Sequence, residues 1–244
     1  SDRMVNDERI WSEDFLIPGT FCVDGGTNTA GALTKWIRNE VFMDLLAIQE
    51  CGGENAFSAM ADLAADVPPG SEGLIVLPYF AGERTPINDP KARGVYFGLL
   101  QSHTRKHLYR AALEGVAYSI AQHVEILKEH GLPIHNFLCV GGGAQNKAWL
   151  QIIADVCGHT VKTAEITIGS SYGDAMIAAI GAGRFSDYGE LSGYIKGGSE
   201  FVPNEENHKL YQGYLSMYER LYEATKPLMH ELTDLQGNVQ NLED

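Results

Sequence analysis

The pattern of apolar and polar positions along the chain predicts strands that alternate with helices. Short apolar runs bounded by glycine or proline indicate strands, and apolar residues spaced three or four apart indicate helices. The expected strands span residues 21–26, 74–80, 95–99, 137–140 and 160–164. The expected helices span residues 28–50, 56–66, 104–130, 147–156, 172–182 and 205–231. This alternation is typical of an α/β or mixed α+β protein.

Three of these helices carry apolar stripes that predict a buried face. In the helix over 28–50 the stripe is Leu33, Trp36, Ile37, Phe42, Leu45 and Leu46. In the helix over 104–130 it is Tyr109, Leu113, Val116, Ile120, Val124 and Leu127. In the last helix it is Leu210, Tyr214, Tyr218 and Leu221. The small-residue helix over 172–182 is expected to pack tightly on a neighbour, and residues 234–244 are expected to form a frayed acidic tail.

Three consecutive glycines, Gly141–Gly143, stand between an expected strand and an expected helix. Glycine loses backbone entropy on folding, so a triplet needs a reason, and close approach of a ligand to the backbone is one. The following helix offers free N–H groups and the positive end of its dipole, which suits phosphate or a nucleotide. Asn146 lies where its amide can bond a ligand. The alternative, a tight turn without a ligand, explains this stretch equally well.

The same stretch also resembles the dinucleotide-binding fingerprint of a Rossmann domain. GGGAQN reads G-x-G-x-x-N, with asparagine where the third glycine or alanine is wanted, and Glu165 lies where the ribose-binding acid belongs. An NAD-dependent oxidoreductase or an adenosylmethionine-binding enzyme is therefore a second hypothesis.

A second glycine-rich junction, VDGGTNTAGALTKW, covers residues 23–36. Gly26 and Gly31 have the spacing of a P-loop, but Ala32 and Leu33 occupy the positions that require lysine and serine or threonine, so a P-loop is rejected. By itself this junction predicts only a helix start capped by Asn28 or Thr29.

The remaining polar motifs favour plain structural interpretations. His103 and His107 have metal-ligand spacing but lack a third ligand, so no metal site is predicted. The loop GERTPINDP over 82–90 is expected to be solvated, although it contains Glu83, Arg84 and Asp89.

Composition narrows the class of protein. The chain has 244 residues, 44% of them hydrophobic, and a formal net charge of −14, which disfavours nucleic-acid binding. No apolar run is long enough for a membrane span. The four cysteines are scattered and are expected to be buried thiols of a reducing compartment, which predicts a cytoplasmic protein. The polar start without methionine suggests a piece of a longer protein.

The two glycine junctions in this order, the loop AGERTPINDPKARGVYFGL and the helix RAALEGVAYSIAQHVEIL together resemble one family. The chain is similar to the C-terminal domain of FGGY carbohydrate kinases from about residue 21 to residue 198. VGGGAQNKAWLQIIADVCGHTV and SSYGDAMIAAIGAG match two characteristic stretches of that family. The GERTP sequence over residues 82–86 resembles that of the xylulose-kinase-like branch of the family.

This resemblance implies an actin-like, ribonuclease-H-like ATPase fold, with a mixed sheet flanked by helices. It also implies ATP and Mg²⁺ as cofactors and a sugar or polyol, most simply a pentulose such as xylulose, as the acceptor of the γ-phosphoryl group. The ATP-binding positions carried over from the family are Gly31, Lys35, Gly142, Gly143 and Asn146.

The resemblance further implies a division of labour with an N-terminal domain. The catalytic base and the phosphate-gripping loop are expected upstream of this chain, so the chain alone is expected to be inactive, and the intact protein is expected to be a homodimer. The implied boundaries are a polar lead-in over 1–20, the kinase domain over 21–232 and the acidic tail over 233–244. A non-catalytic actin-like nucleotide-binding module is a third hypothesis.

Overall fold

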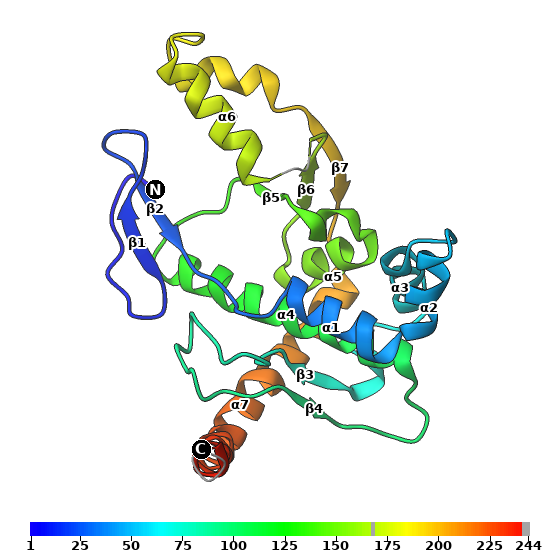
Figure 1. Cartoon of the computed structure of the whole chain (residues 1–244). Helices are drawn as coiled ribbons and strands as arrows, with labels where there is room; N and C mark the ends of the chain where they lie inside the picture. The colour runs from blue at the N-terminus through cyan, green and yellow to red at the C-terminus, as the bar shows by residue number, and fades with distance from the viewer. Residues whose placement is uncertain (167–168, 241–244) are drawn as a thin grey trace.

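One long helix, α4 (Arg105–Glu129), runs through the middle of the molecule (Figure 1). The computed structural model describes residues 1–166 and 169–240. Every residue of α4 from Tyr109 to Ser119 is buried, whereas the sequence predicted a single buried face. The reason is that α4 has neighbours on several sides and contacts helices and strands from the whole length of the chain. The predicted stripe is nevertheless part of the core, with Leu113 and Val116 almost inaccessible to solvent.

The region expected as one helix over 28–50 forms two helices, α1 (Gly31–Val41) and α2 (Met43–Glu50). The break occurs at Phe42, whose φ of −117° and ψ of 38° are not helical. Phe42 is fully buried and packs edge-on against Tyr109 of α4, with the ring centroids 6.1 Å apart. Burial of this ring against α4 accompanies the turn that ends α1, and an uninterrupted helix was the wrong prediction.

A three-stranded mixed sheet carries the glycine triplet. β5 (Phe137–Cys139) pairs with β6 (Val161–Ala164) in parallel, and β6 pairs with β7 (Gly197–Phe201) in antiparallel. The connection from β5 to β6 contains α5 (Lys147–Cys157), which packs on α4. The helix over 147–156 was expected from the sequence, but β7 was not, because GGSEF is poor in strand-forming residues.

The other described strands form two antiparallel pairs. β3 (Ile75–Leu77) is antiparallel to β4 (Val95–Phe97), and β1 (Trp11–Asp14) is antiparallel to β2 (Phe21–Asp24). β3 lies directly on α4 at Gly115, where a Cβ atom would stand 2.4 Å from the carbonyl oxygen of Val76. Only glycine permits so close an approach of helix and strand.

The segment before β2 packs on the domain. Val5 and Ile10 are buried against Ile126 of α4. Asp7 accepts hydrogen bonds from Arg9 and from the ring of His130, and these bonds hold the pKa of its carboxyl well below the usual range. The domain boundary at residue 20 stays a prediction, but this segment contacts the C-terminal part of α4 through both apolar and polar side chains.

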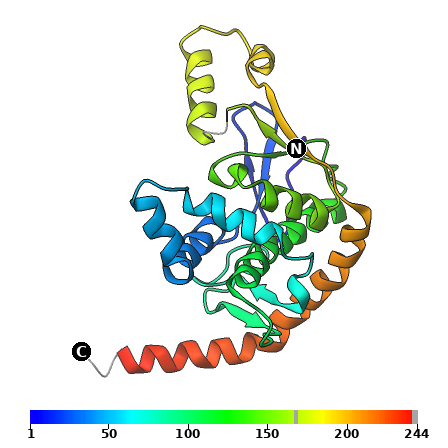
Figure 2. The same cartoon turned by 90° about the vertical axis from the view of Figure 1, so that its right-hand side faces the viewer.

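The helix α6 (Ser170–Gly181) lies apart from the central helices, beyond the edge of the β5–β6–β7 sheet (Figures 1 and 2). None of its residues is buried. The expectation of tight packing on a neighbour was therefore wrong for the arrangement that the structure describes. Small residues permit close packing but do not supply a partner.

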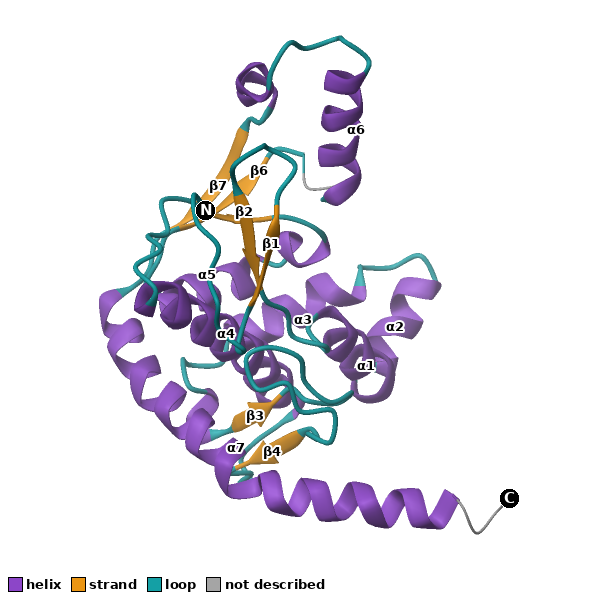
Figure 3. Ribbon diagram, turned by 90° about the vertical axis from the view of Figure 1, so that its left-hand side faces the viewer, coloured by secondary structure: helices purple, strands orange, loops and turns teal. Residues whose placement is uncertain are grey.

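α3 (Ala56–Ala65) packs on α4 and α5. The last helix, α7 (Glu205–Gln240), packs on α4, α5 and β3 and then extends from the body after a bend (Figure 3). Pro227 lies inside it and cannot donate the helical hydrogen bond. The helix continues nine residues past the expected end, and residues 241–244 of the expected tail lie outside the described residues. Leu210 is 46% exposed, so the predicted stripe was wrong there; the buried residues include Tyr211, Leu215, Tyr218 and Tyr222.

In the part of the chain that the structure describes, no helix combines the length and the apolar character needed to cross a membrane. All four cysteines are free thiols. Only Cys157 is buried, which raises its pKa to about 12, whereas Cys51 is exposed, contrary to the expectation of four buried thiols.

Candidate functional site

The first glycine junction leads from β2 into α1. No side chain caps the N-terminus of α1, where Ala30 occupies the cap position, and no acidic residue lies in its first turn. The first N–H groups of a helix have no partner inside the helix and attract anions. Gly31 and Lys35 are both exposed on α1. Their backbone and ammonium groups are thus accessible to a ligand.

The second junction leads from β5 into α5 through a short 3-10 turn, η2 (Gly142–Gln145). Gly141 has a φ of 85°, a backbone conformation that favours glycine. A Cβ atom on Gly142 would meet nothing within 4 Å, whereas a Cβ atom on Gly143 would stand 3.4 Å from the ring of Trp149. The face of the turn at Gly142 is therefore open, and the backbone there can be approached by a ligand.

Asn146 is the N-cap of α5. Its side-chain oxygen accepts a hydrogen bond from the N–H of Trp149 at 3.0 Å, and its amide nitrogen donates to the hydroxyl of Tyr109 at 3.2 Å. An amide nitrogen carries two donors, so one N–H remains for a ligand. The side chain stabilises the turn whether or not it also binds a nucleotide.

The structure places Gly142, Gly143 and Asn146 in one turn, and it places Gly31 and Lys35 together on α1. Tyr109 of α4 contacts Phe42, which follows the C-terminal end of α1, and Asn146 at the start of α5. Gly31 lies at the opposite end of α1 from Phe42. Gly169 at the start of α6 also lies next to the glycine turn, because its Cβ position is 3.9 Å from the Cα of Gly141.

The loop over residues 82–90 was expected to be solvated, but four of its residues are buried, Gly82, Glu83, Thr85 and Asp89, and it holds the first junction. Glu83 is 3% exposed and Thr85 is inaccessible to solvent. The carboxylate of Glu83 accepts hydrogen bonds from the hydroxyl of Thr27 at 2.7 Å and from the N–H of Asn28 at 2.8 Å. Burial raises the pKa of Glu83, and these hydrogen bonds act in the opposite direction.

Thr85 holds the neighbouring residue of the same turn. Its hydroxyl oxygen accepts from the N–H of Gly26 at 2.7 Å and lies 2.9 Å from Nε2 of His123. Nδ1 of His123 lies 2.8 Å from the carbonyl oxygen of Ser119. A carbonyl only accepts, so the proton of the neutral ring sits on Nδ1 and the hydroxyl donates to Nε2. The ring of His123 also occupies the space that a side chain at Gly25 would need.

The sequence offered little reason to select this loop. Its charged residues resemble a solvent-exposed surface, and only its place between two short apolar strands distinguishes it from one.

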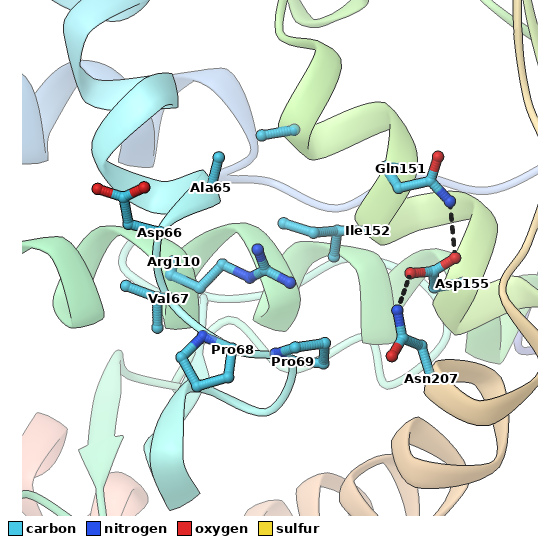
Figure 4. A pocket seen from close by; sticks show the side chains of 11 residues that line it. Ala65, Asp66, Val67, Pro68, Pro69, Arg110, Gln151, Ile152, Asp155 and Asn207 are labelled. Atoms are coloured by element: carbon cyan, nitrogen blue, oxygen red, sulfur yellow. Dashed lines mark hydrogen bonds between the residues drawn. The ribbon is translucent and has the colours of Figure 1, made fainter.

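One pocket, of about 410 Å³, lies elsewhere, among the end of α3, α4, α5 and the start of α7 (Figure 4). Arg110 projects into it but already donates to Glu114, to the carbonyl oxygen of Ala64 and to Tyr211. Asp155 likewise accepts from Gln151 and Asn207 (Figure 4). Arg110 and Asp155 therefore have partners within the protein, and their hydrogen bonds connect α4, α5 and α7 rather than indicate a ligand.

One group of possible metal ligands occurs among the described residues: Glu13, Cys22 and Asp24, on the β1–β2 pair. Both acids are exposed, and the thiol is a poor ligand for a hard cation such as Mg²⁺. Burial, followed by the nearby carboxylates, raises the pKa of Cys22 and so disfavours the thiolate. This group does not match the Mg²⁺ site expected beside ATP.

Comparison with known proteins supports the family resemblance drawn from the glycine junctions. Residues 6–182 match the FGGY family of carbohydrate kinases, C-terminal domain. The match covers most of the chain, and the chain therefore belongs to this family.

The similar proteins are sugar kinases. The chain is 35% identical over 217 residues to the xylulose kinase of Staphylococcus epidermidis, which is 88% of this chain and 42% of that protein. It is 33% identical over 90% of its length to the xylulose kinase of Bacillus subtilis, and 29% identical over 89% to the gluconokinase of the same species. The chain thus spans about two fifths of the length of these relatives.

Solved structures agree on the fold. The crystal structure of xylulose kinase from Rhodospirillum rubrum superimposes with a TM-score of 0.79 at 32% identity, covering 94% of this chain and 45% of that one. A kinase structure from Brucella ovis gives a TM-score of 0.77 at 27% identity, covering 91% and 44%. The actin-like ATPase fold is confirmed, and the Rossmann hypothesis has no support, since the glycine turn belongs to a mixed sheet in an FGGY domain.

Proposed function

We propose that this chain is the ATP-side domain of a kinase that transfers the γ-phosphoryl group of ATP to a hydroxyl of a pentulose or polyol, with xylulose the first candidate. One observation carries the proposal: the identity of 35% to a xylulose kinase over 88% of the chain. Gluconokinases match at lower identity, which makes gluconate the second candidate.

The proposed ATP-binding residues come from both glycine junctions. The open backbone at Gly142, the neighbouring Gly143 and the remaining amide N–H of Asn146 would hold the adenosine. The uncapped first turn of α1 at Gly31 and the ammonium group of Lys35 would interact with the same nucleotide. The exposure of Gly31 and Lys35 and the open Cβ position at Gly142 support this assignment.

Phosphoryl transfer depends mainly on positioning and on electrostatic stabilisation of the spreading charge. Mg²⁺, when bound with ATP, neutralises part of the phosphate charge and is usually held by substrate phosphates and a few carboxylates. This chain would contribute the nucleotide-holding backbone. The proton-accepting base and most sugar contacts would come from an N-terminal domain, whose closure onto this one would exclude water. We place the enzyme in the cytoplasm and expect a homodimer.

The test is a kinase assay on the full-length protein in which this chain occurs. Mg·ATP is supplied with xylulose, ribulose, gluconate, xylitol and glycerol in parallel, and ADP release is compared with a reaction that lacks sugar. We expect xylulose to give the highest kcat/KM. A higher kcat/KM for gluconate would instead assign the protein to the gluconokinases. Tight ATP binding without phosphorylation of any acceptor would favour a non-catalytic actin-like module instead.

A further inference from the structure

We propose that Glu83 is a positioning residue for nucleotide binding: its buried carboxylate fixes the turn over residues 26–29, from which the uncapped N-terminus of α1 starts. This inference rests on the proposed function, because it assigns Gly31 and Lys35 of α1 to ATP. Glu83 itself would not touch the nucleotide.

The carboxylate is surrounded by donors from the protein. The hydroxyl of Thr27 donates to Oε2, and the N–H groups of Asn28 and Arg84 donate to Oε1 at 2.8 Å each. All three partners are donors in this arrangement, so an acceptor-only group satisfies them together. Because Glu83 is 3% exposed, water has little access to replace a lost acceptor.

Every residue of the 26–29 turn is held by the segment over 78–85. Besides the two bonds to Glu83, Gly26 donates to Thr85 and the Asn28 side chain donates to the carbonyl oxygen of Ala81. Thr29 donates its hydroxyl to the carbonyl oxygen of Pro78. Gly31, the first residue of α1, follows two positions later, so the path of this turn sets where the free N–H groups of α1 point.

Within α1 itself, no side chain fixes that end. The helix has no side-chain cap, and its first turn has no acidic residue. A conventional cap would satisfy the first N–H groups and compete with an anionic ligand. Glu83 belongs to another loop and binds the turn that precedes α1. It therefore holds the start of α1 in place without occupying the first N–H groups of the helix.

The test compares Glu83→Ala with Glu83→Gln in the full-length protein, with the ATP dissociation constant measured by calorimetry and KM determined for ATP and for sugar. Glutamine keeps an oxygen for the two N–H groups, and its NH₂ can donate to the hydroxyl of Thr27, which then accepts. Alanine leaves buried donors unpaired, so we expect its ATP dissociation constant to rise about tenfold or more, with the sugar KM unchanged. Glutamine should restore binding to within about threefold of the native value.

Asp155→Ala is the matched control. Asp155 is equally buried and also accepts from a backbone N–H and two side-chain amides, but at the α5–α7 contact. It should lower the melting temperature without a selective effect on ATP. If Glu83→Ala binds ATP as the native protein does, or loses affinity for sugar and ATP to the same extent, the positioning role is wrong. Failure of the native protein to bind ATP would instead overturn the proposed function.

Discussion

The glycines of the second junction differ in the atoms that a side chain at each position would contact. A substitution at one of them can therefore affect ligand binding without affecting the stability of the fold. A side chain at Gly143 would press on Trp149, which is 7% exposed and donates its indole N–H to the carbonyl oxygen of Leu113. A substitution there would disturb the core as well as any ligand. Gly142, one residue earlier, has open space around its Cβ position. It is the cleaner position at which to test the nucleotide-binding proposal.

We predict that Gly142→Val weakens ATP binding and leaves the melting temperature nearly unchanged. An overpacked contact costs about 1–3 kcal/mol, which corresponds to a rise of roughly 5- to 150-fold in the dissociation constant. Calorimetric titration with Mg·ATP and a thermal melt of the full-length protein measure the two effects. Gly143→Val should affect both quantities.

Gly213→Ala provides the control, because this exposed glycine of α7 also has open space around its Cβ position. Alanine should raise the free energy of unfolding by about 0.5–1 kcal/mol and leave ATP affinity alone. An unchanged ATP dissociation constant for Gly142→Val would place the nucleotide away from this turn.

At the scale of elements, strong apolar periodicity predicted most helices. Elements and breaks without a clear local pattern were not predicted. The stripe through Leu113 and Val116 located α4 to within one residue at each end, because long apolar periodicity leaves little ambiguity. β1, with the sequence WSED, gave no strand pattern, and it forms by pairing with β2. The break at Phe42 was equally hidden, since apolar spacing continues through it and only the tertiary contact with Tyr109 distinguishes two helices from one.

The candidate site followed the same rule. The glycine turn and the start of α1 stood out in the sequence because glycine at a strand–helix junction has few other uses. Glu83 did not, because its role depends on a contact across 55 sequence positions to Asn28. Burial of a loop carboxylate depends on the tertiary fold, so the local sequence pattern does not predict it.

The outer part of α7 depends on one buried acid of the same loop. Asp89 accepts hydrogen bonds from the hydroxyl of Tyr222 and from the ring of His230, both of α7, at 2.8 Å. It also accepts from the N–H of Lys91. Burial alone would raise the pKa of Asp89, but these hydrogen bonds outweigh it and lower the pKa. The carboxylate therefore connects the loop to α7 on both sides of Pro227.

This lowered pKa predicts an acid-dependent release of the end of α7. The stabilisation is present when the pH lies above the ordinary value of about 3.9 and is lost as the pH falls through the lowered folded-state value. Hydrogen exchange of residues 228–236, corrected for the intrinsic pH dependence, should therefore lose protection at acid pH before α4 does. In Asp89→Ala the protection should already be low at pH 7 and show no such step. Equal protection in both proteins would mean that Asp89 does not hold the helix.

At the scale of the whole molecule, the chain accounts for about two fifths of the related kinases and for one side of the proposed reaction. The helices that follow the two glycine junctions, α1 and α5, both pack on α4, and the turn before α1 is held by the 78–85 segment, an arrangement that suits the proposed nucleotide binding. Among the described residues, the exposed Asp24 of β2 lies near Glu13 and Cys22 and forms no side-chain hydrogen bond or ion pair.

We therefore predict that the 244-residue chain by itself does not phosphorylate xylulose above the background of the reaction without enzyme. Transfer requires a base at the acceptor hydroxyl and closure over the γ-phosphate, and both are assigned to the N-terminal domain. The measurement is ADP release with saturating Mg·ATP, made on protein whose helical circular dichroism confirms folding, beside the full-length kinase at equal concentration. Slow hydrolysis of ATP without sugar phosphate would be compatible with a nucleotide site open to water. Formation of sugar phosphate by the isolated chain would show that the base lies within these residues, and Asp24 would then be the first acid to replace.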